Sequence, residues 1–114
     1  MLKNVSLIVY PAADLTAAKR FFRELTGSDP YLDSPQYVGY KSGDMEIGLD
    51  PNGKHEHGAL AYWSVSDIAA SVKALVAAGG TVVKEVTDVG YGLLVANLKD
   101  GNGVTVGLRQ LPKS

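Results

Sequence analysis

Three charged residues near the ends of two short apolar segments are the candidates for acid–base chemistry. Glu46 and Asp50 lie in the segment 45–50, and Arg109 lies near the end of the last apolar segment. A carboxylate can abstract a proton and a guanidinium can stabilise the resulting charge, provided that the groups meet in one pocket. Glu46, Asp50 and Arg109 are therefore the catalytic candidates, although charged side chains on strand faces are usually solvated.

The histidines and cysteines limit the metal chemistry. His55 and His57 form a His-x-His pair, a spacing that binds metal when both imidazoles share a strand face. The pair sits in the polar connector 52–58, which is typical of a solvated loop. The chain has no cysteine, which excludes disulfides and thiolate sites. It also has no dinucleotide fingerprint and no phosphate loop, so we expect no cofactor.

The elements that must position these residues occur twice in the same order. The first half is predicted to contain strands over 5–10, 30–33, 36–41 and 45–50, and a helix between Asp14 and Gly27. The second half is predicted to contain strands over 59–65, 81–87, 90–98 and 104–110, and a helix capped by Ser66 or Asp67 and ended by Gly79–Gly80. Each half therefore reads as β-α-β-β-β.

Matching details indicate that the two halves are a duplication. The same interval separates Asp14 from Gly27 and Asp67 from Gly80, and Ile-Gly-Leu at 47–49 corresponds to Val-Gly-Leu at 106–108. We predict one α+β domain over 1–114, with modules 1–53 and 58–112. One helix covers only one face of each sheet, so the halves should pair round a cleft, within one chain or between two.

Strand alternation predicts which side chains line that cleft. Ile47, Leu49, Val106 and Leu108 should pack on the helices, as should Trp63, so Gly48 and Gly107 face the other way. These glycines leave room and expose backbone, and tyrosines offer flat apolar faces with a hydroxyl. The predicted ligand-binding residues are Ser6, Tyr10, Tyr37, Gly48, Leu60, Tyr62, Tyr91, Thr105, Gly107 and Arg109.

The chain resembles the vicinal oxygen chelate superfamily, which includes glyoxalase I, extradiol dioxygenases, fosfomycin-inactivating transferases and bleomycin-resistance proteins. The resemblance covers essentially the whole chain. It rests on the paired module order, the first helix with Asp14-Leu15 and Phe21-Phe22, the helix exit Gly79-Gly80-Thr81-Val82, and the ending Lys99 to Leu108. It implies two tandem βαβββ modules whose curled mixed sheets surround a cleft.

The resemblance also supplies a test for a metal ion. Metal-dependent members hold one divalent ion with His, Glu or Gln side chains at the start of each half's first strand and near the end of its last strand. Here those positions fall on Gly48, Gly107, Leu60 and one of the residues 5–7, which are Val, Ser and Leu. None is a usual ligand. The resemblance therefore brings no metal and no metal-dependent glyoxalase reaction to this chain.

The residues favour a binding protein over an enzyme. By analogy with the bleomycin-resistance branch, we expect a metal-free homodimer that sequesters a small aromatic or antibiotic-like molecule. The alternative is a metal-dependent glyoxalase-type lyase or isomerase, or a dioxygenase-like enzyme, with Glu46, His55 or His57 as unconventional ligands. A metal-free enzyme with Glu46 or Asp50 as base is a further alternative.

Composition excludes several partners. The 114 residues carry a net charge of −1 without a basic run, so nucleic-acid binding is not expected. The longest apolar stretch, 5–13, is interrupted by Ser6 and Pro11 and is too short to span a bilayer. We expect a cytoplasmic protein without membrane contact.

Overall fold

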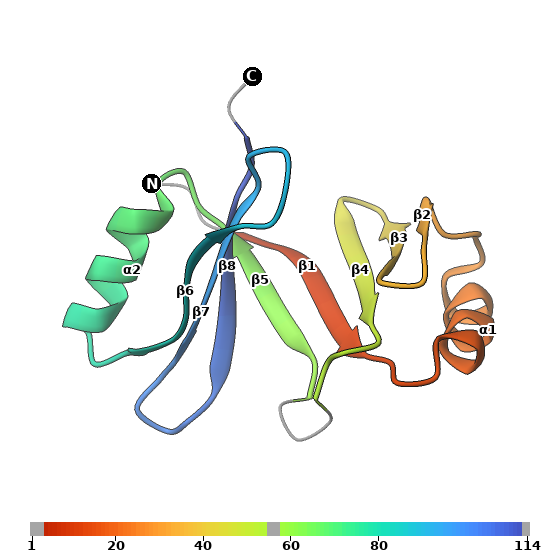
Figure 1. The fold of residues 1–114 in the computed structure, drawn as a ribbon, viewed down its shortest axis with the longest axis horizontal. Coiled ribbons are helices and arrows are strands. Elements are labelled where there is room, and N and C mark those ends of the chain that lie inside the picture. The colour runs from red at the N-terminus through yellow and green to blue at the C-terminus, as the bar shows by residue number, and fades with distance from the viewer. Residues whose placement is uncertain (1–3, 55–57, 113–114) are drawn as a thin grey trace. The chain divides into compact units, whose positions relative to one another are not determined.

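The computed structural model describes residues 4–54 and 58–112 (Figure 1). The chain divides into two compact units. The first unit is Ser6–Ala61, and the second holds Asn4, Val5 and the described residues from Tyr62 onwards. Each unit has its own cluster of buried apolar side chains, so each sheet and helix pair packs round a core of its own.

The element order is the predicted one. The first βαβββ module consists of β1 (Asn4–Pro11), α1 (Leu15–Thr26), β2 (Leu32–Asp33), β3 (Val38–Ser42) and β4 (Met45–Asp50). The second consists of β5 (Leu60–Ser64), α2 (Ile68–Ala77), β6 (Thr81–Asp88), β7 (Leu94–Lys99) and β8 (Thr105–Gln110). The α+β class with two tandem βαβββ modules is confirmed.

Both modules use the same strand order. In the first, the order is β2-β3-β4-β1, with β1 parallel to β4 and the other pairs antiparallel. In the second, it is β5-β8-β7-β6, with β5 parallel to β8. In each module the helix connects the first strand to a strand at the far edge, and the parallel pair therefore places the first and last strands of the module side by side.

Helix α1 is fixed at both ends by the predicted residues. Asp14 caps it by accepting the Ala17 N–H at 3.0 Å, and Gly27 ends it in the left-handed conformation at φ 71°. Its apolar stripe packs on a core that contains Tyr40 and Leu49. Leu25 is not part of this packing, since it is 66% exposed. Leu25 sits in the last turn at the margin of the stripe, because an apolar spacing of 3.5 residues drifts round a helix of 3.6 residues per turn.

Helix α2 is capped by Asp67 and not by Ser66, since the Asp67 carboxylate accepts the Ala70 N–H at 3.0 Å. Its first free N–H, on Ile68, donates to Gln110 Oε1 at 2.8 Å and so joins the helix start to β8. Ile68 lies in the core, whereas Val76 is 47% exposed. Val76 follows Ile68 by eight residues, and at 3.6 residues per turn its side chain points well away from the direction of Ile68.

The predicted strand 90–98 begins only at Leu94. Gly90, Tyr91 and Gly92 all have positive φ, at 123°, 55° and 80°, which no strand can accommodate. They form a turn between β6 and β7. Neither described helix approaches the length of about 20 apolar residues that a membrane crossing needs, because α1 has 12 residues and α2 has 10.

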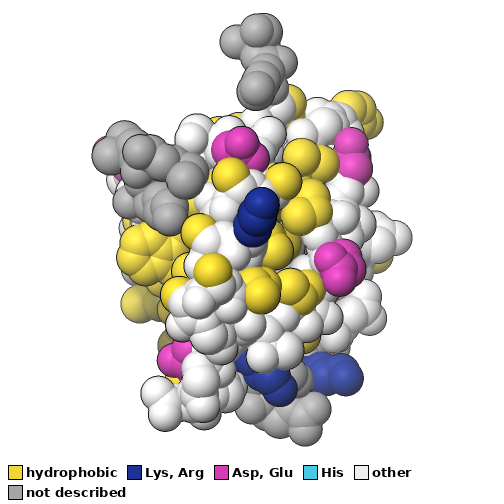
Figure 2. Space-filling model, turned by 90° about the vertical axis from the view of Figure 1, so that its left-hand side faces the viewer, with side chains coloured by type: hydrophobic (Ala, Val, Ile, Leu, Met, Phe, Trp, Pro, Cys, Tyr) yellow, Lys and Arg dark blue, Asp and Glu magenta, His cyan; other side chains and the backbone are white. Residues whose placement is uncertain are grey.

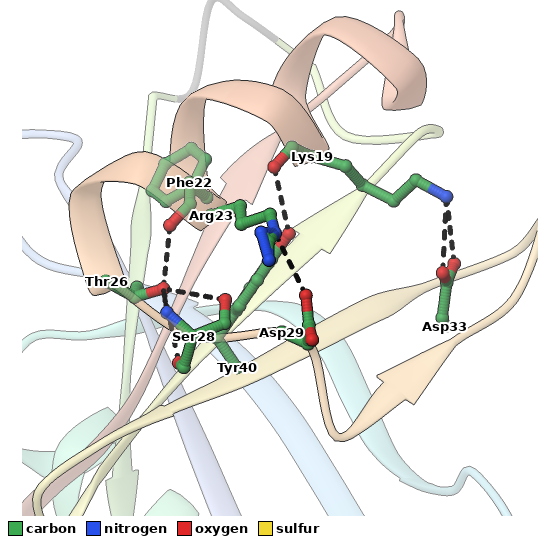
Figure 3. Close-up of polar contacts among 8 residues, drawn as sticks. All are labelled: Lys19, Phe22, Arg23, Thr26, Ser28, Asp29, Asp33 and Tyr40. Atoms are coloured by element: carbon green, nitrogen blue, oxygen red, sulfur yellow. Dashed lines mark hydrogen bonds and ion pairs between the residues drawn. The ribbon is translucent and has the colours of Figure 1, made fainter.

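Tyr40 joins α1 to the sheet of the first unit (Figure 3). Its side chain is fully buried, and its hydroxyl donates to the Lys19 carbonyl at 3.2 Å. Lys19 extends to Asp33 and Arg23 to Asp29, at 3.1 and 3.0 Å, on the exposed side of the helix. Burial raises the pKa of Tyr40, and the negative charge of Asp33 raises it further.

We predict that Tyr40→Phe lowers the free energy of unfolding by about 0.5–1.5 kcal/mol at neutral pH, the usual contribution of one intramolecular hydrogen bond. Because the folded-state pKa of Tyr40 is raised, its contribution is complete below about pH 10 and is lost as the pH rises through the folded-state pKa. Urea unfolding between pH 7 and about pH 11 should show the wild type and Tyr40→Phe converging. Tyr91→Phe, which alters an exposed hydroxyl, is the control, and parallel curves for Tyr40→Phe would contradict the prediction.

The hairpin between β7 and β8 depends on one carboxylate. Asp100 Oδ1 accepts the N–H groups of Asn102 and Val104 at 2.8 and 2.9 Å. The Val104 hydrogen bond, followed by that of Asn102, lowers the pKa of Asp100. The ionised carboxylate therefore holds the turn that brings β8 back along β7.

We predict that Asp100→Asn destabilises the protein above the unfolded-state pKa of aspartate, near 4, and that the difference disappears as the pH falls through the lowered folded-state pKa. Thermal melts from pH 7 down to about pH 2.5 measure this. Asp44→Asn removes the same charge from the hairpin between β3 and β4 and serves as the control. An Asp100→Asn deficit that persists undiminished at the acid end would contradict the prediction.

Candidate functional site

Each sheet has one face that packs on its helix and one that does not, which we call the helix-free face. Leu49 and Leu108 are buried in the two cores, Ile47 packs against the first core, and Val106 lies beside Leu75 of α2. The prediction that these four side chains face the helices is confirmed. Because side chains alternate along a strand, Gly48 and Gly107 lie on the helix-free faces.

In the first unit, Tyr37 covers Gly48. A side-chain carbon added to Gly48 would overlap the Tyr37 hydroxyl and ring edge. Tyr37 stands just before β3 and is held by Ser34, whose Oγ accepts the Tyr37 N–H at 3.1 Å and donates to its carbonyl at 3.0 Å. The turn thus directs the phenol back across the sheet, onto a backbone position that only glycine leaves open.

A second tyrosine lies on the same face of the first unit. Gly39 pairs with Gly48 across β3 and β4, and a Cβ on Gly39 would come within 2.9 Å of the Tyr31 ring. The Tyr31 hydroxyl donates to Glu46 Oε1 at 2.5 Å, and Lys41 Nζ lies 5.3 Å from the ring centroid. Two phenol rings therefore rest on two adjacent glycines, with one carboxylate and one ammonium group at the margin.

In the second unit, Tyr62 covers Gly107. The two residues are paired in register between β5 and β8, and a Cβ on Gly107 would overlap the Tyr62 ring. The Tyr62 hydroxyl accepts a hydrogen bond from Asn97 Nδ2 at 3.3 Å, and Asn97 is opposite Gly107 on β7. A half-buried phenol thus lies over a glycine here as well.

The space above the two glycines is filled, whereas it was expected to be open. The sequence suggested that the missing side chains open a groove, but in each unit a tyrosine of that same unit takes up the space directly over the glycine. The helix-free faces therefore carry a phenol ring over the glycine at each of these points.

Strand registers now place all four positions where the metal-dependent relatives carry ligands. Asp50 and Arg109 hold equivalent positions on the last strands of the two modules, and they pair with Pro11 on β1 and Ser64 on β5. Leu7 lies four residues before Pro11, and Leu60 lies four residues before Ser64. Leu7 is therefore the counterpart of Leu60. The four positions hold two leucines and two glycines. Among residues 4–54 and 58–112, no three His, Cys, Asp or Glu side chains are grouped to hold a metal ion. These residues do not fit a bound divalent ion.

The three catalytic candidates are not brought together. Glu46 and Asp50 are four residues apart on β4, which separates them by about 13 Å. Asp50 Oδ1 accepts the Asn52 N–H at 2.9 Å, a contact that shapes the turn after β4. Arg109 belongs to the second unit, where it is buried on β8. Within either unit these groups do not form an acid–base set.

Two predicted ligand-binding residues face the helix instead. Tyr10 is in register with the core residue Leu49, and its ring lies 5.0 Å from that of Phe22 on α1. Ser6 shares the Tyr10 side of β1 by alternation. The orientation expected for both was wrong, because the sequence Ser-Leu-Ile-Val-Tyr contains no pattern that separates its two faces.

The remaining predicted residues are placed as follows. Leu60 shares the side of Tyr62 on β5, and Thr105 shares that of Gly107 on β8. Tyr91 is fully exposed in the turn 90–92. Trp63 is on the α2 side, as predicted, and borders a hollow of about 280 Å³ with Ser71, Leu75, Val106 and Leu108. Figure 2, which views the α2 side, shows hydrophobic side chains gathered there. His55 and His57 lie outside the described residues.

Tyr31 and Asn97 were not among the predicted ligand-binding residues. Asn97 had a usable signal, since it is a polar residue within the otherwise apolar run Leu-Val-Ala-Asn-Leu. Tyr31 had none, because it precedes a strand of two residues and reaches the site only through the fold of the turn before β3.

The structure is similar to several solved structures over nearly its whole length. A hypothetical protein from Bacillus halodurans matches with a TM-score of 0.80 at 15% identity, covering 100% of this chain and 98% of that one. A methylmalonyl-CoA epimerase from Streptomyces coelicolor, in complex with 2-nitronate-propionyl-CoA, matches with a TM-score of 0.72 at 16% sequence identity. The match covers 96% of this chain and 98% of that one. The methylmalonyl-CoA epimerase from Mycobacterium tuberculosis matches with a TM-score of 0.69 at 18% sequence identity. The match covers 96% of this chain and 88% of that one. At such identities the likeness concerns the fold alone.

Sequence comparison gives the family. No curated protein matches the chain. The family model of the Glyoxalase/Bleomycin resistance protein/Dioxygenase superfamily matches residues 4–108, which include the first βαβββ module, all but the last two residues of the second, and both tyrosine-covered glycines. The chain belongs to the glyoxalase/bleomycin resistance protein/dioxygenase superfamily.

Proposed function

We propose that this chain is a metal-free binding protein of its superfamily, which takes a small planar aromatic ligand on its tyrosine-bearing helix-free faces. The observation that carries the proposal is the placement of a tyrosine directly over a last-strand glycine in each unit, Tyr37 over Gly48 and Tyr62 over Gly107. The phenols stand where relatives that use a metal have a ligand side chain. The chain thus has an aromatic surface in place of a coordination site.

Physical chemistry favours an aromatic ligand on such a surface. A tyrosine ring seated on a flat glycine backbone offers an aromatic surface, and offset stacking of two aromatic rings contributes about 0.5–1.5 kcal/mol beyond apolar burial. Both Tyr37 and Tyr62 are half-buried, so little rotamer freedom is lost when a ligand docks. Bleomycin-resistance members of the superfamily, which the sequence resembles, sequester a drug without transforming it.

The direct test is calorimetric titration with a panel of planar aromatic compounds of one to three rings, aromatic antibiotics included. We expect at least one binder with a Kd in the micromolar to millimolar range, about −4 to −8 kcal/mol. Elemental analysis should find no stoichiometric divalent metal, and treatment with a chelator should leave the affinity unchanged. A panel without any binder would refute the proposal. A stoichiometric metal whose removal abolishes binding would favour the metal-dependent enzyme, with Glu46, His55 or His57 among its ligands.

The tyrosine variants locate the ligand. We expect Tyr37→Ala or Tyr62→Ala to weaken aromatic binding by about 3- to 10-fold, the scale of one lost aromatic contact. Phe21→Ala, which removes an aromatic side chain that is 64% exposed on α1, is the matched control and should leave the affinity unchanged. Equal affinities for all the variants would place the ligand elsewhere and would contradict the tyrosine surface.

Glycine substitution tests the packing itself. We expect Gly107→Ala to lower the free energy of unfolding by about 1–3 kcal/mol, the usual cost of overpacking, because the new methyl group must displace the Tyr62 ring. It should also weaken the aromatic binder found above. Gly101→Ala adds the same methyl group where nothing lies within 4 Å and should be close to neutral. Denaturant unfolding of both variants measures the difference, and equal stabilities would show that Tyr62 does not occupy the space over Gly107.

A further inference from the structure

The helix side of the second unit has a hollow in its apolar packing. The hollow has a volume of about 280 Å³ and is bordered by Trp63, Ser71, Leu75, Val106 and Leu108. Trp63 is 38% exposed, so the hollow is open to solvent beside the indole ring. An apolar cavity of about 150 Å³ is enough to hold a benzene molecule. The hollow therefore has room for a small ring.

The duplication shows what fills the same space in the first unit. The matched helix caps, first strands and last-strand glycines give the counterparts of the five bordering residues, in the same order: Tyr10, Ala18, Phe22, Ile47 and Leu49. All five belong to the core of the first unit or pack against it. The centroids of the Phe22 and Tyr10 rings are 5.0 Å apart. An aromatic side chain of the helix thus occupies this space in the first unit.

Smaller side chains leave the space open in the second unit. Leu75 of α2 stands where α1 has Phe22, and Val106 stands where β4 has Ile47. Atoms that border an open space lack the dispersion contacts that a filled core provides. A bound ring would supply Trp63, Leu75 and Val106 with contacts of the kind that Phe22 makes in the first unit.

The polarity of the hollow limits what can bind there. Ser71 is its one polar side chain besides the indole N–H, and it is fully buried. Within the described part of the chain, every buried side-chain nitrogen or oxygen has a hydrogen-bond partner, so the Ser71 hydroxyl is satisfied inside the protein. A polar atom of a ligand would lose its water in the hollow without gaining a partner. The enclosed part of the ligand must therefore be apolar.

We propose that the hollow between α2 and the sheet of the second unit binds a small neutral hydrocarbon ring of the size of the Phe22 side chain. The ring lies against Trp63 as Phe22 lies against Tyr10. Because Trp63 and Tyr62 point to opposite sides of β5, this site is separate from the tyrosine-bearing face and does not depend on it.

The test uses toluene, which is the free equivalent of a phenylalanine side chain. Trp63 is the only tryptophan, so its fluorescence reports on the hollow directly. We expect a saturable blue shift of the emission with a Kd of about 1 mM or tighter. 4-Methylpyridine in its neutral form has the same shape with one ring nitrogen, and calorimetric titration should show binding at least about fivefold weaker.

Two results with the wild-type chain would overturn the proposal. One is the absence of a saturable shift with toluene, as when a second copy of the chain already covers the hollow. The other is equal affinity for toluene and 4-methylpyridine, because a site without free hydrogen-bonding groups must discriminate against the ring nitrogen. Either result would leave the proposed function standing, since that function concerns the other face of the sheet.

Variants that copy the first unit assign the site to residues. Leu75→Phe supplies the ring internally and should weaken toluene binding at least about tenfold. Leu25→Phe makes the same substitution on α1, where the side chain is 66% exposed, and should leave toluene binding unchanged. Circular dichroism establishes that each variant folds. If Leu75→Phe does not fold, Val106→Ile takes its place, with toluene binding weakened at least about threefold. A folded variant that retains full toluene affinity would overturn the proposal.

Discussion

The absence of a side chain at one position of each last strand is the constraint on which the helix-free faces depend. Gly48 and Gly107 are buried, and each lies under a phenol that would collide with any Cβ. Glycine normally weakens a strand, because it costs backbone entropy and offers nothing to pack. Here the close approach of Tyr37 and Tyr62 compensates for that cost, and it removes the position from which a metal ligand would project.

The two halves reach the same arrangement with different residues. Tyr62 stands on β5, and the equivalent position on β1, opposite Gly48, holds Val9. Tyr37 comes instead from the turn before β3, and the residue that corresponds to Tyr37 in the second half is Val95. An internal duplication fixes the backbone frame and the glycine, whereas the tyrosine that fills the space arrives from a different element in each half.

Charge distinguishes the two faces more than shape does. By register, Glu46 corresponds to Thr105 and Asp50 to Arg109, so the last strand of the first unit carries carboxylates where that of the second carries a hydroxyl and a guanidinium.

The amino-acid sequence by itself determined the βαβββ repeat, the Asp14 cap, the Gly27 helix end and the helix-side packing of Leu49 and Leu108, and it narrowed the second cap to Ser66 or Asp67. These features follow from local rules of capping, turn conformation and periodicity, which act within a few residues. Family membership also followed from the sequence, because the repeat and the ending 99–108 are contiguous in the chain.

Only the tertiary structure decided which tyrosines share the helix-free faces. The side of Tyr10 depends on its register with Leu49, and the overlap of Tyr37 with the space over Gly48 depends on a turn held by Ser34. Strand register and the direction of a turn are set by pairing between segments distant in the chain, and a shift of one residue reverses every side chain. Alternation along a single strand therefore predicts that two faces exist, but not which residues from other elements cover them.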